Sequence, residues 1–457
     1  MAQTAKLDDR FDAEIERYLK DHWNQILDDL RTLVRIESID GSPSASKDAP
    51  YGPGPRKALD AIIGIADRMG FETHDLGGYI AYADWPGETE TQLGIICHVD
   101  VVPAGPGWTF HPFELTEHEG YLVGRGVADD KGPLVICLHA LKFWKDSGAC
   151  FPYTVRFLFG ADEEVGMHDV AYYRAHCPDP AFLFTPDAEF PVCYGEKGIY
   201  QATAKSKPVG TRTIERIEGG MTVNAVPGEA HASFVDVSRD DIVAKGRTAH
   251  ASTPDLGVNA ISLLASELLD ENLASDEERT FLEFARRLCG STDGSAFGIA
   301  CADDDFGALT ICGGMIRYAD GIFTQTIDIR YPTAISSQQI TDALVSKLDP
   351  LGIELTVEND KEPFLIDSSS PVIRALTEAY ERATGCEAKP FTMGGGTYAR
   401  EFERAASFGM EKTGIERPEW IGGMHAPNEA ISIAEYKDAF RIYAYAIAKL
   451  METDITA

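Results

Sequence analysis

Three features are missing from this 457-residue sequence, and each absence removes a class of protein. No run of lysine and arginine occurs, and 73 acidic residues against 41 basic ones give a formal charge of −32. A surface of that charge repels phosphate backbones and anionic membranes. No uncharged apolar stretch reaches the ~20 residues that a membrane-spanning helix needs. We therefore expect neither nucleic acid nor a membrane as a partner.

The nine cysteines form no recognisable metal or redox motif. They are scattered, and no pair has the Cys-x-x-Cys spacing of a structural zinc site or a redox centre. Residues 1–30 alternate acidic, basic and apolar side chains at helical spacing, and they lack the basic segment and apolar core of a signal peptide. Both features predict a cytoplasmic protein with reduced thiols.

Length and hydrophobic pattern predict two domains, because 457 residues exceed what one hydrophobic core usually organises. The first part alternates amphipathic helices with apolar strands, which is typical of an α/β sheet covered by helices on both faces. We predict an α/β domain of residues 1–197 and 370–457, into which an α+β domain of residues 198–369 is inserted. The predicted helices span Asp12–Val34, Arg56–Met69, Pro133–Lys145, Ile261–Leu269, Ser336–Leu348, Pro371–Ala383 and Ala434–Met451, and the predicted strands span Leu93–Cys97, Tyr153–Phe159, Ala181–Phe184, Tyr200–Lys205 and Phe323–Arg330.

Polar side chains follow the apolar strands of the predicted α/β domain. The strand Leu93–Cys97 leads into His98 and Asp100, which face the same side because side chains alternate along a strand. One of the two can bind a metal ion while the other orients it, since a carboxylate behind a ligating imidazole fixes its tautomer.

Further acids and a second imidazole occur at other strand ends and in loops. Each is ordinary when taken singly, because adjacent acids usually start a solvated helix and a lone histidine in a glycine-rich loop usually has no special role. Together, His, Asp and Glu ligands without Cys fit an open catalytic site for divalent cations. Strand ends are also where an open α/β sheet binds ligands. These further candidates are Asp129, Asp130, Glu163, Glu164, Asp187 and His425.

Five motifs resemble, in this order, those of the M20 family of metallopeptidases. They are HVD at 98–100, GRGVADDKG at 124–132, ADEEVG at 161–166, PDAEFP at 186–191 and GGMHAPNE at 422–429. The resemblance spans nearly the whole chain and is closest to bacterial dipeptidases of the PepV type. It implies a zinc-aminopeptidase-like catalytic domain, with a central mixed sheet covered by helices, and an inserted α+β, ferredoxin-like lid domain.

The resemblance also implies a centre of two divalent metal ions, with Zn²⁺ as the first choice and Mn²⁺ or Co²⁺ as alternatives. Asp129 is expected to bridge the ions, and its peptide bond with Asp130 is expected to be cis. Asp100 is expected to orient a ligating histidine, and Glu163 to act as the general base for a metal-activated water. The implied ligands are His98, Asp129 and Asp187 for one ion and Asp129, Glu164 and His425 for the other.

His250 matches the residue that stabilises the oxyanion of the tetrahedral intermediate in this family. PepV-type enzymes supply this histidine from their own enlarged lid, whereas many relatives borrow it from a partner subunit. We therefore expect a functional monomer, with a homodimer as the alternative.

Arg330 resembles the arginine of this family that binds a substrate carboxylate, and its alternative interpretation is a structural salt bridge. Asn224 and the backbone of Gly394, Gly395 and Gly396 can supply further donors. If the lid holds the carboxylate and the metals hold the scissile carbonyl, only one residue fits between them. This predicts hydrolysis of dipeptides or similarly short peptides. An N-acyl amino-acid deacylase of the acetylornithine or succinyl-diaminopimelate type is the alternative, because it shares the metals and the base.

Overall fold

The computed structural model describes residues 9–41, 45–412 and 414–457, and it divides the chain into two compact units. The first unit comprises the chain up to Tyr194 together with Ile366–Phe391 and Thr397–Ala457. The second unit comprises Gly195–Leu365 and Thr392–Gly396, so it is inserted into the sequence of the first. Within the described ranges, no helix has the length and apolar character needed to cross a membrane.

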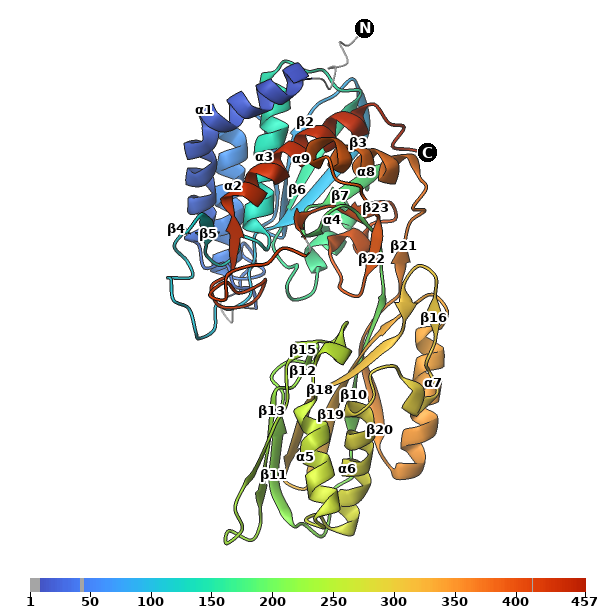
Figure 1. Ribbon diagram of the computed structural model, residues 1–457. Helices are drawn as coiled ribbons and strands as arrows, with labels where there is room; N and C mark the ends of the chain where they lie inside the picture. The colour runs from blue at the N-terminus through green and yellow to red at the C-terminus, as the bar shows by residue number, and fades with distance from the viewer. Residues whose placement is uncertain (1–8, 42–44, 413) are drawn as a thin grey trace. The chain divides into compact units, whose positions relative to one another are not determined.

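The first unit is built on six strands of a nine-stranded mixed sheet, in the order β1-β2-β6-β3-β7-β23, and β9, β21 and β22 continue that sheet beyond β23 (Figure 1). β6, β3, β7 and β23 run parallel, whereas β2 is antiparallel to both β1 and β6. This arrangement brings the carboxyl ends of the parallel strands to one edge of the sheet. The six strands are β1 (Glu72–Leu76), β2 (Ile80–Trp85), β3 (Thr89–His98), β6 (Tyr153–Gly160), β7 (Phe182–Thr185) and β23 (Ala405–Ser407).

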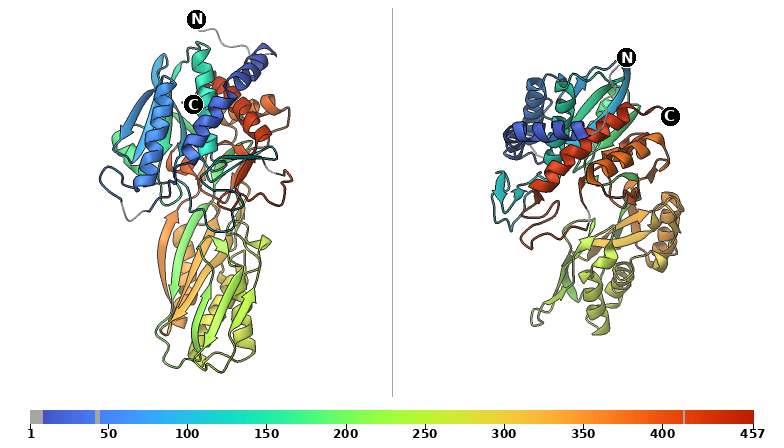
Figure 2. Two further views of the ribbon diagram at one scale, coloured as in Figure 1. Left: turned by 90° about the vertical axis from the view of Figure 1, so that its left-hand side faces the viewer. Right: turned by 45° about the horizontal axis from the view of Figure 1, so that its top comes forward.

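Helices cover both faces of this sheet. Ile95 and Phe157 point into a core formed with α1, α2, α3, α8 and α9, and α9 lies beside α1 and α3 (Figure 2). On the other face, Tyr173 of α4 packs edge-on against Tyr82 of β2. The helices are α1 (Asp9–Val34), α2 (Pro53–Arg68), α3 (Lys131–Asp146), α4 (His168–His176), α8 (Pro371–Thr384), α9 (Ile433–Met451) and the 3-10 helix η4 (Tyr398–Glu401).

Short strands complete the first unit and lead into the second. β25, β5 and β4 form a small antiparallel sheet, and β24 pairs with β8 in parallel. The short strands are β4 (Thr116–His118), β5 (Tyr121–Val123), β8 (Ala188–Glu189), β9 (Cys193–Glu196), β21 (Phe364–Leu365), β22 (Phe391–Met393), β24 (Met410–Glu411) and β25 (Ala430–Ser432).

The second unit is a seven-stranded antiparallel sheet with the order β14-β13-β11-β18-β19-β10-β20. Buried and partly exposed residues alternate along β10, as expected for a strand with one face on a core. Helices α5, α6 and α7 supply that core. The main elements are β10 (Gly198–Lys205), β11 (Ile214–Gly219), β13 (Glu229–Phe234), β14 (Ile242–Lys245), β18 (Thr310–Ala319), β19 (Ile322–Tyr331), β20 (Glu354–Lys361), α5 (Ala260–Asp270), α6 (Asp276–Cys289) and α7 (Ser337–Leu348).

Two strand pairs and three short 3-10 helices complete the second unit. They are β12 (Ala225–Val226) with β15 (Ala249–His250), β16 (Ala302–Asp303) with β17 (Gly307–Ala308), and η1 (Pro254–Leu256), η2 (Ser295–Phe297) and η3 (Asp349–Leu351). The fold class predicted from the sequence is confirmed: a mixed sheet covered by helices carries an inserted α+β unit.

Candidate metal centre

The candidate ligands come from the carboxyl ends of parallel strands and from two loops of the first unit. His98 is the last residue of β3, Glu164 follows β6, and Asp187 follows β7. Asp129 lies between β5 and α3, and His425 lies between β24 and β25. The register of β3 and β6 pairs His98 with Gly160, so the residues after these strands start at the same edge.

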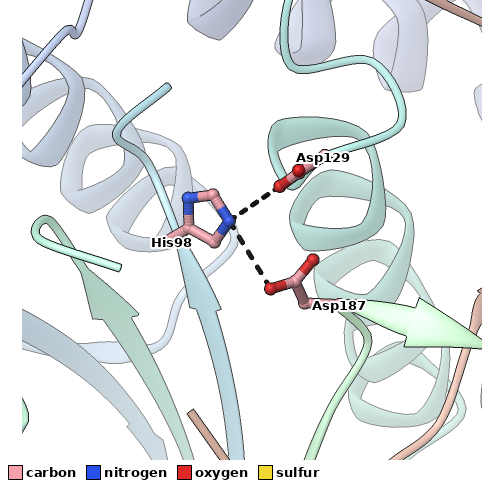
Figure 3. Close-up of side chains that lie close together, drawn as sticks. All are labelled: His98, Asp129 and Asp187. Atoms are coloured by element: carbon pink, nitrogen blue, oxygen red, sulfur yellow. Dashed lines mark hydrogen bonds and ion pairs between the residues drawn. The ribbon is translucent and has the colours of Figure 1, made fainter. Parts of the chain in front are cut away.

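His98, Asp129 and Asp187 form the first ligand group (Figure 3). The Nε2 atom of His98 lies 2.9 Å from Asp129 Oδ1 and 3.6 Å from Asp187 Oδ2. Ligand atoms bound to one ion at ~2.0–2.1 Å in tetrahedral geometry are separated by roughly 3.3 Å. The spacing in this group therefore fits a bound divalent ion.

Asp129, Glu164 and His425 form the second ligand group. The Nε2 atom of His425 lies 2.9 Å from Asp129 Oδ2 and 3.0 Å from Glu164 Oε2. Asp129 thus presents one carboxylate oxygen to each group. The backbone of His425 has a positive φ of 64°. The peptide bond between Asp129 and Asp130 is cis, as the resemblance implied.

Asp100 lies behind His98, and its contacts fix the imidazole tautomer. The Nδ1 atom of His98 lies 3.0 Å from the backbone oxygen of Asp100 and 3.4 Å from its Oδ1. Because both oxygens only accept hydrogen bonds, Nδ1 carries a proton, which leaves Nε2 as the ring atom that would bind a metal ion. Asp100 Oδ2 also accepts a hydrogen bond from the backbone N–H of Glu164 at 3.1 Å. Asp100 therefore links both ligand groups.

The acids of this centre have strongly perturbed pKa values. Burial and the neighbouring Asp129 raise the pKa of Asp187 to about 8. Burial and Asp187 raise the pKa of Glu163 well above its usual value. For His425, burial alone would lower the pKa, but hydrogen bonds to Asp129 and Glu164 raise it to about 11. Crowded buried carboxylates of this kind are compensated by divalent cations, so the donor set fits metal ions in charge as well as in spacing.

The predicted substrate-binding residues lie together within the second unit. The backbone N–H of Ala251 donates to the oxygen of Asn224 at 2.9 Å, which places Asn224 beside His250. A Cβ atom on Gly394 would lie 2.6 Å from the Cβ of Ser252, so this close approach requires glycine. Gly395 and Gly396 follow in the same segment, Thr392–Gly396.

Ser252 fixes the tautomer of His250. The Nδ1 atom of His250 accepts a hydrogen bond from the backbone N–H of Ser252 at 3.2 Å and lies 2.7 Å from its Oγ. Because a backbone N–H can only donate, Nδ1 is unprotonated in the neutral ring, and Nε2 carries the proton. In the exposed imidazole of His250, the N–H group is therefore on Nε2.

Arg330 is 4% exposed and forms the salt bridge that the sequence left open as its alternative role. Its Nε and Nη2 donate to the two oxygens of Asp328 at 2.6 and 3.1 Å, and its Nη1 donates to the oxygen of Gly394 at 2.9 Å. Among the described residues, these bonds leave two of the five guanidinium N–H groups, one on each of Nη1 and Nη2. Asp328 thus orients the guanidinium without exhausting its donors.

Comparison with known proteins identifies the family. The sequence profile of peptidase family M20/M25/M40 matches residues 94–449. This chain belongs to that family. A protein of Staphylococcus epidermidis (strain ATCC 12228 / FDA PCI 1200) named "Putative dipeptidase" is 33% identical over 466 residues, covering 94% of this chain and 98% of the relative.

Solved structures share the fold of this M20 peptidase. Human carnosine dipeptidase 1 aligns with a TM-score of 0.64 at 16% identity, over 96% of this chain and 98% of that chain. A Bacillus subtilis protein described as a dinuclear metal binding peptidase from the M20 family aligns with a TM-score of 0.52 at 12% identity, over 95% of this chain and 100% of that chain. The family prediction is confirmed, and both ligand groups lie within the matched range.

A buried pair that was not predicted from the sequence supports the loop after β6 in this M20 peptidase. The hydroxyl of Tyr398 donates to Asp169, whose Oδ2 also accepts from the backbone N–H of Ala161 at 2.7 Å. A Cβ atom on Gly160 would lie 2.0 Å from the Tyr398 hydroxyl, so β6 must end in glycine. This loop carries both Glu163 and Glu164. The signal available in the sequence was Tyr398 within the motif GGGTYAR, although its partner could not be inferred.

Proposed function

We propose that this M20 peptidase hydrolyses the peptide bond of dipeptides or short peptides with two divalent metal ions, Zn²⁺ being the first choice. The observation that carries the proposal is the pair of ligand groups that share Asp129. His98 and Asp187 would complete one site, and Glu164 and His425 the other. When bound, two such ions polarise a carbonyl and lower the pKa of a water molecule.

Glu163 is the general base in this proposal. It neighbours Glu164 on the loop after β6 but belongs to neither ligand group among the described residues. Burial and Asp187 raise its pKa, which increases its affinity for a proton. Glu163 takes the proton of the attacking water and delivers it to the leaving amine.

Residues of the second unit bind the substrate in this proposal. The Nε2–H of His250 donates to the oxyanion, and the two remaining N–H groups of Arg330 bind a C-terminal carboxylate. Asn224 and the backbone of Gly394–Gly396 supply further donors. The name of the Staphylococcus epidermidis relative, with which the chain aligns over 94% of its length, supports a dipeptide as the substrate.

The test is a substrate panel assayed with purified full-length protein and added Zn²⁺, Mn²⁺ or Co²⁺. The panel contains unblocked dipeptides, tetrapeptides, C-terminally amidated dipeptides and N-acyl amino acids. We expect the highest kcat/KM on unblocked dipeptides, a loss of activity with a chelator, and recovery when metal is restored. Preferential turnover of N-acyl amino acids would replace this proposal with a deacylase. Chelator-resistant activity would exclude the metal mechanism.

A further inference from the structure

The fully buried carboxylate of Glu429 faces the loop that carries Asp129. Its Oε1 accepts hydrogen bonds from three backbone N–H groups, those of Gly126 (3.0 Å), Ala128 (2.9 Å) and Asp129 (3.2 Å). Its Oε2 accepts a hydrogen bond from Nη1 of the buried Arg125 at 2.6 Å. One side chain thus receives four donors of this loop. Glu429 was not among the candidate residues that the sequence indicated.

Glu429 also belongs to the loop that carries His425. Gly422 forms a backbone bridge with Glu429, which closes this loop around the histidine. A Cβ atom on Gly422 would lie 2.0 Å from the oxygen of Pro427, so only glycine allows the closure. The backbone oxygen of Glu429 accepts a hydrogen bond from the N–H of Gly124 at 3.1 Å. Glu429 therefore connects the loop that carries His425 with the segment that precedes Asp129.

We propose that Glu429 is a positioning residue that orients Asp129 and couples it to His425, so that both metal sites depend on one buried carboxylate. The inference rests on the proposed function, because it requires Asp129 and His425 to be metal ligands. An oxygen that receives converging backbone N–H groups holds the peptide planes of a loop in fixed directions. Asp129 supplies one of the three N–H groups that Glu429 binds. Fixing the peptide plane of Asp129 therefore also fixes the direction in which its side chain points.

Two variants of Glu429 separate its charge from its reach. In Glu429→Gln, one oxygen can still accept the three N–H groups, but the amide nitrogen then faces Nη1 of Arg125. The amide N–H groups of the new glutamine and the N–H groups of Arg125 are both donors and cannot bond to each other, and the buried guanidinium loses its counter-charge. Glu429→Asp keeps the charge but is one methylene shorter, so it cannot serve both sets of donors at once. For each variant we expect metal affinity to fall by about 10- to 100-fold, the usual loss when a partner of a metal ligand is changed.

Glu278 in the second unit provides a matched control. Its carboxylate is fully buried and accepts hydrogen bonds from the backbone N–H groups of Thr213 (3.2 Å), Ile214 (3.1 Å) and Ser275 (2.8 Å). Glu278 is therefore, like Glu429, a buried carboxylate that binds several backbone N–H groups, but it lies in the second unit, whereas the two ligand groups lie in the first. Glu278→Gln should lower thermal stability and leave metal affinity unchanged.

The experiment titrates metal-free, full-length wild type and variants with Mn²⁺ by calorimetry, and it records the visible absorption of the Co²⁺-loaded proteins and the Tm of the metal-free proteins. We expect Glu429→Gln to weaken both Mn²⁺ binding steps and to change the Co²⁺ spectrum, unlike Glu278→Gln. If Glu429→Gln does not fold, Glu429→Asp decides by the same measurements.

The outcomes distinguish the inference from the proposed function. If wild type binds two ions and the Glu429 variants match its affinities and spectrum, the inference is overturned and the proposed function stands. If wild type binds fewer than two ions, the proposed function is overturned, and the inference falls with it.

Discussion

Replacing each of the adjacent glutamates Glu163 and Glu164 by glutamine separates proton transfer from metal binding. Both changes remove one negative charge and keep the shape of the side chain, and both lie on the same loop between β6 and α4. Any general disturbance of the loop should therefore affect the two variants alike. A difference between them reports the individual roles of the two carboxylates.

The expected magnitudes follow from where the two carboxylates lie. Glu164 Oε2 is 3.0 Å from His425 Nε2 within the second ligand group. The carboxylates of the two ligand groups are those of Asp129, Asp187 and Glu164, and among the described residues Glu163 belongs to neither group. Glu164→Gln removes a charged oxygen from a proposed ligand, so we expect its metal affinity to fall by at least about 100-fold, the upper end of the loss for outer partners of a ligand. Glu163→Gln should bind metal almost normally but lower kcat by about 10²- to 10⁴-fold, the usual contribution of a general base.

The assay measures metal content after dialysis at a fixed free metal concentration, together with kcat and KM for an unblocked dipeptide over a metal titration. Added metal should restore much of the activity of Glu164→Gln and none of that of Glu163→Gln. Equal metal content and equal rescue in the two variants would refute the division of roles. Loss of metal from Glu163→Gln alone would exchange the two assignments.

Two further predictions concern the second unit. Arg330→Met should reduce kcat/KM for unblocked dipeptides by about 30- to 1000-fold, since losing one partner of a buried charged hydrogen bond costs roughly 2–4 kcal/mol. The change also leaves Asp328 without this salt bridge. Equal losses of kcat/KM on amidated dipeptides would therefore mean that Arg330 acts only through the salt bridge. Ser252→Ala should lower kcat by about 2- to 10-fold with little change in KM, as expected for the loss of one neutral hydrogen bond that orients His250. Ser252→Thr keeps the hydroxyl and should retain activity. An unchanged kcat in Ser252→Ala would show that the Ser252 hydroxyl does not orient His250.

The strand ends could be located from the sequence because the apolar runs are unambiguous. Leu93–Cys97 lies within β3, and Ala181–Phe184 overlaps β7, so His98 could be placed at the end of one buried strand and Asp187 just after another. Parallel pairing then brings these ends to one edge, which is a property of the sheet and not of any single residue. This part of the candidate site could be predicted from the pattern because backbone topology brings these side chains together, whereas the two ligand sets were implied only by the resemblance to the M20 family.

The supporting contacts could not be predicted, because they join segments that are remote in the sequence. Glu429 binds the backbone of a loop about 300 residues away, and Tyr398 binds Asp169 across 229 positions. No local periodicity records which donors a buried carboxylate will meet. The helix α6 was not predicted, although Ser275 and Glu278 form a capping box at its start and the Ser-x-x-Glu pattern stands in the sequence.

The ligands of the candidate centre come from five segments that lie between positions 98 and 425, so no ligand group exists in the unfolded chain. Folding the first unit brings these acids together out of water, and the cost is visible in the raised pKa values of Asp187 and Glu163. Bound cations would recover that cost, and the free energy of metal binding would then count as folding free energy. The hydrogen bonds of Glu429 should also favour metal binding, because they hold the backbone of Asp129 in place. Folding of the first unit thus orders most of the site, and bound cations would then neutralise its carboxylates.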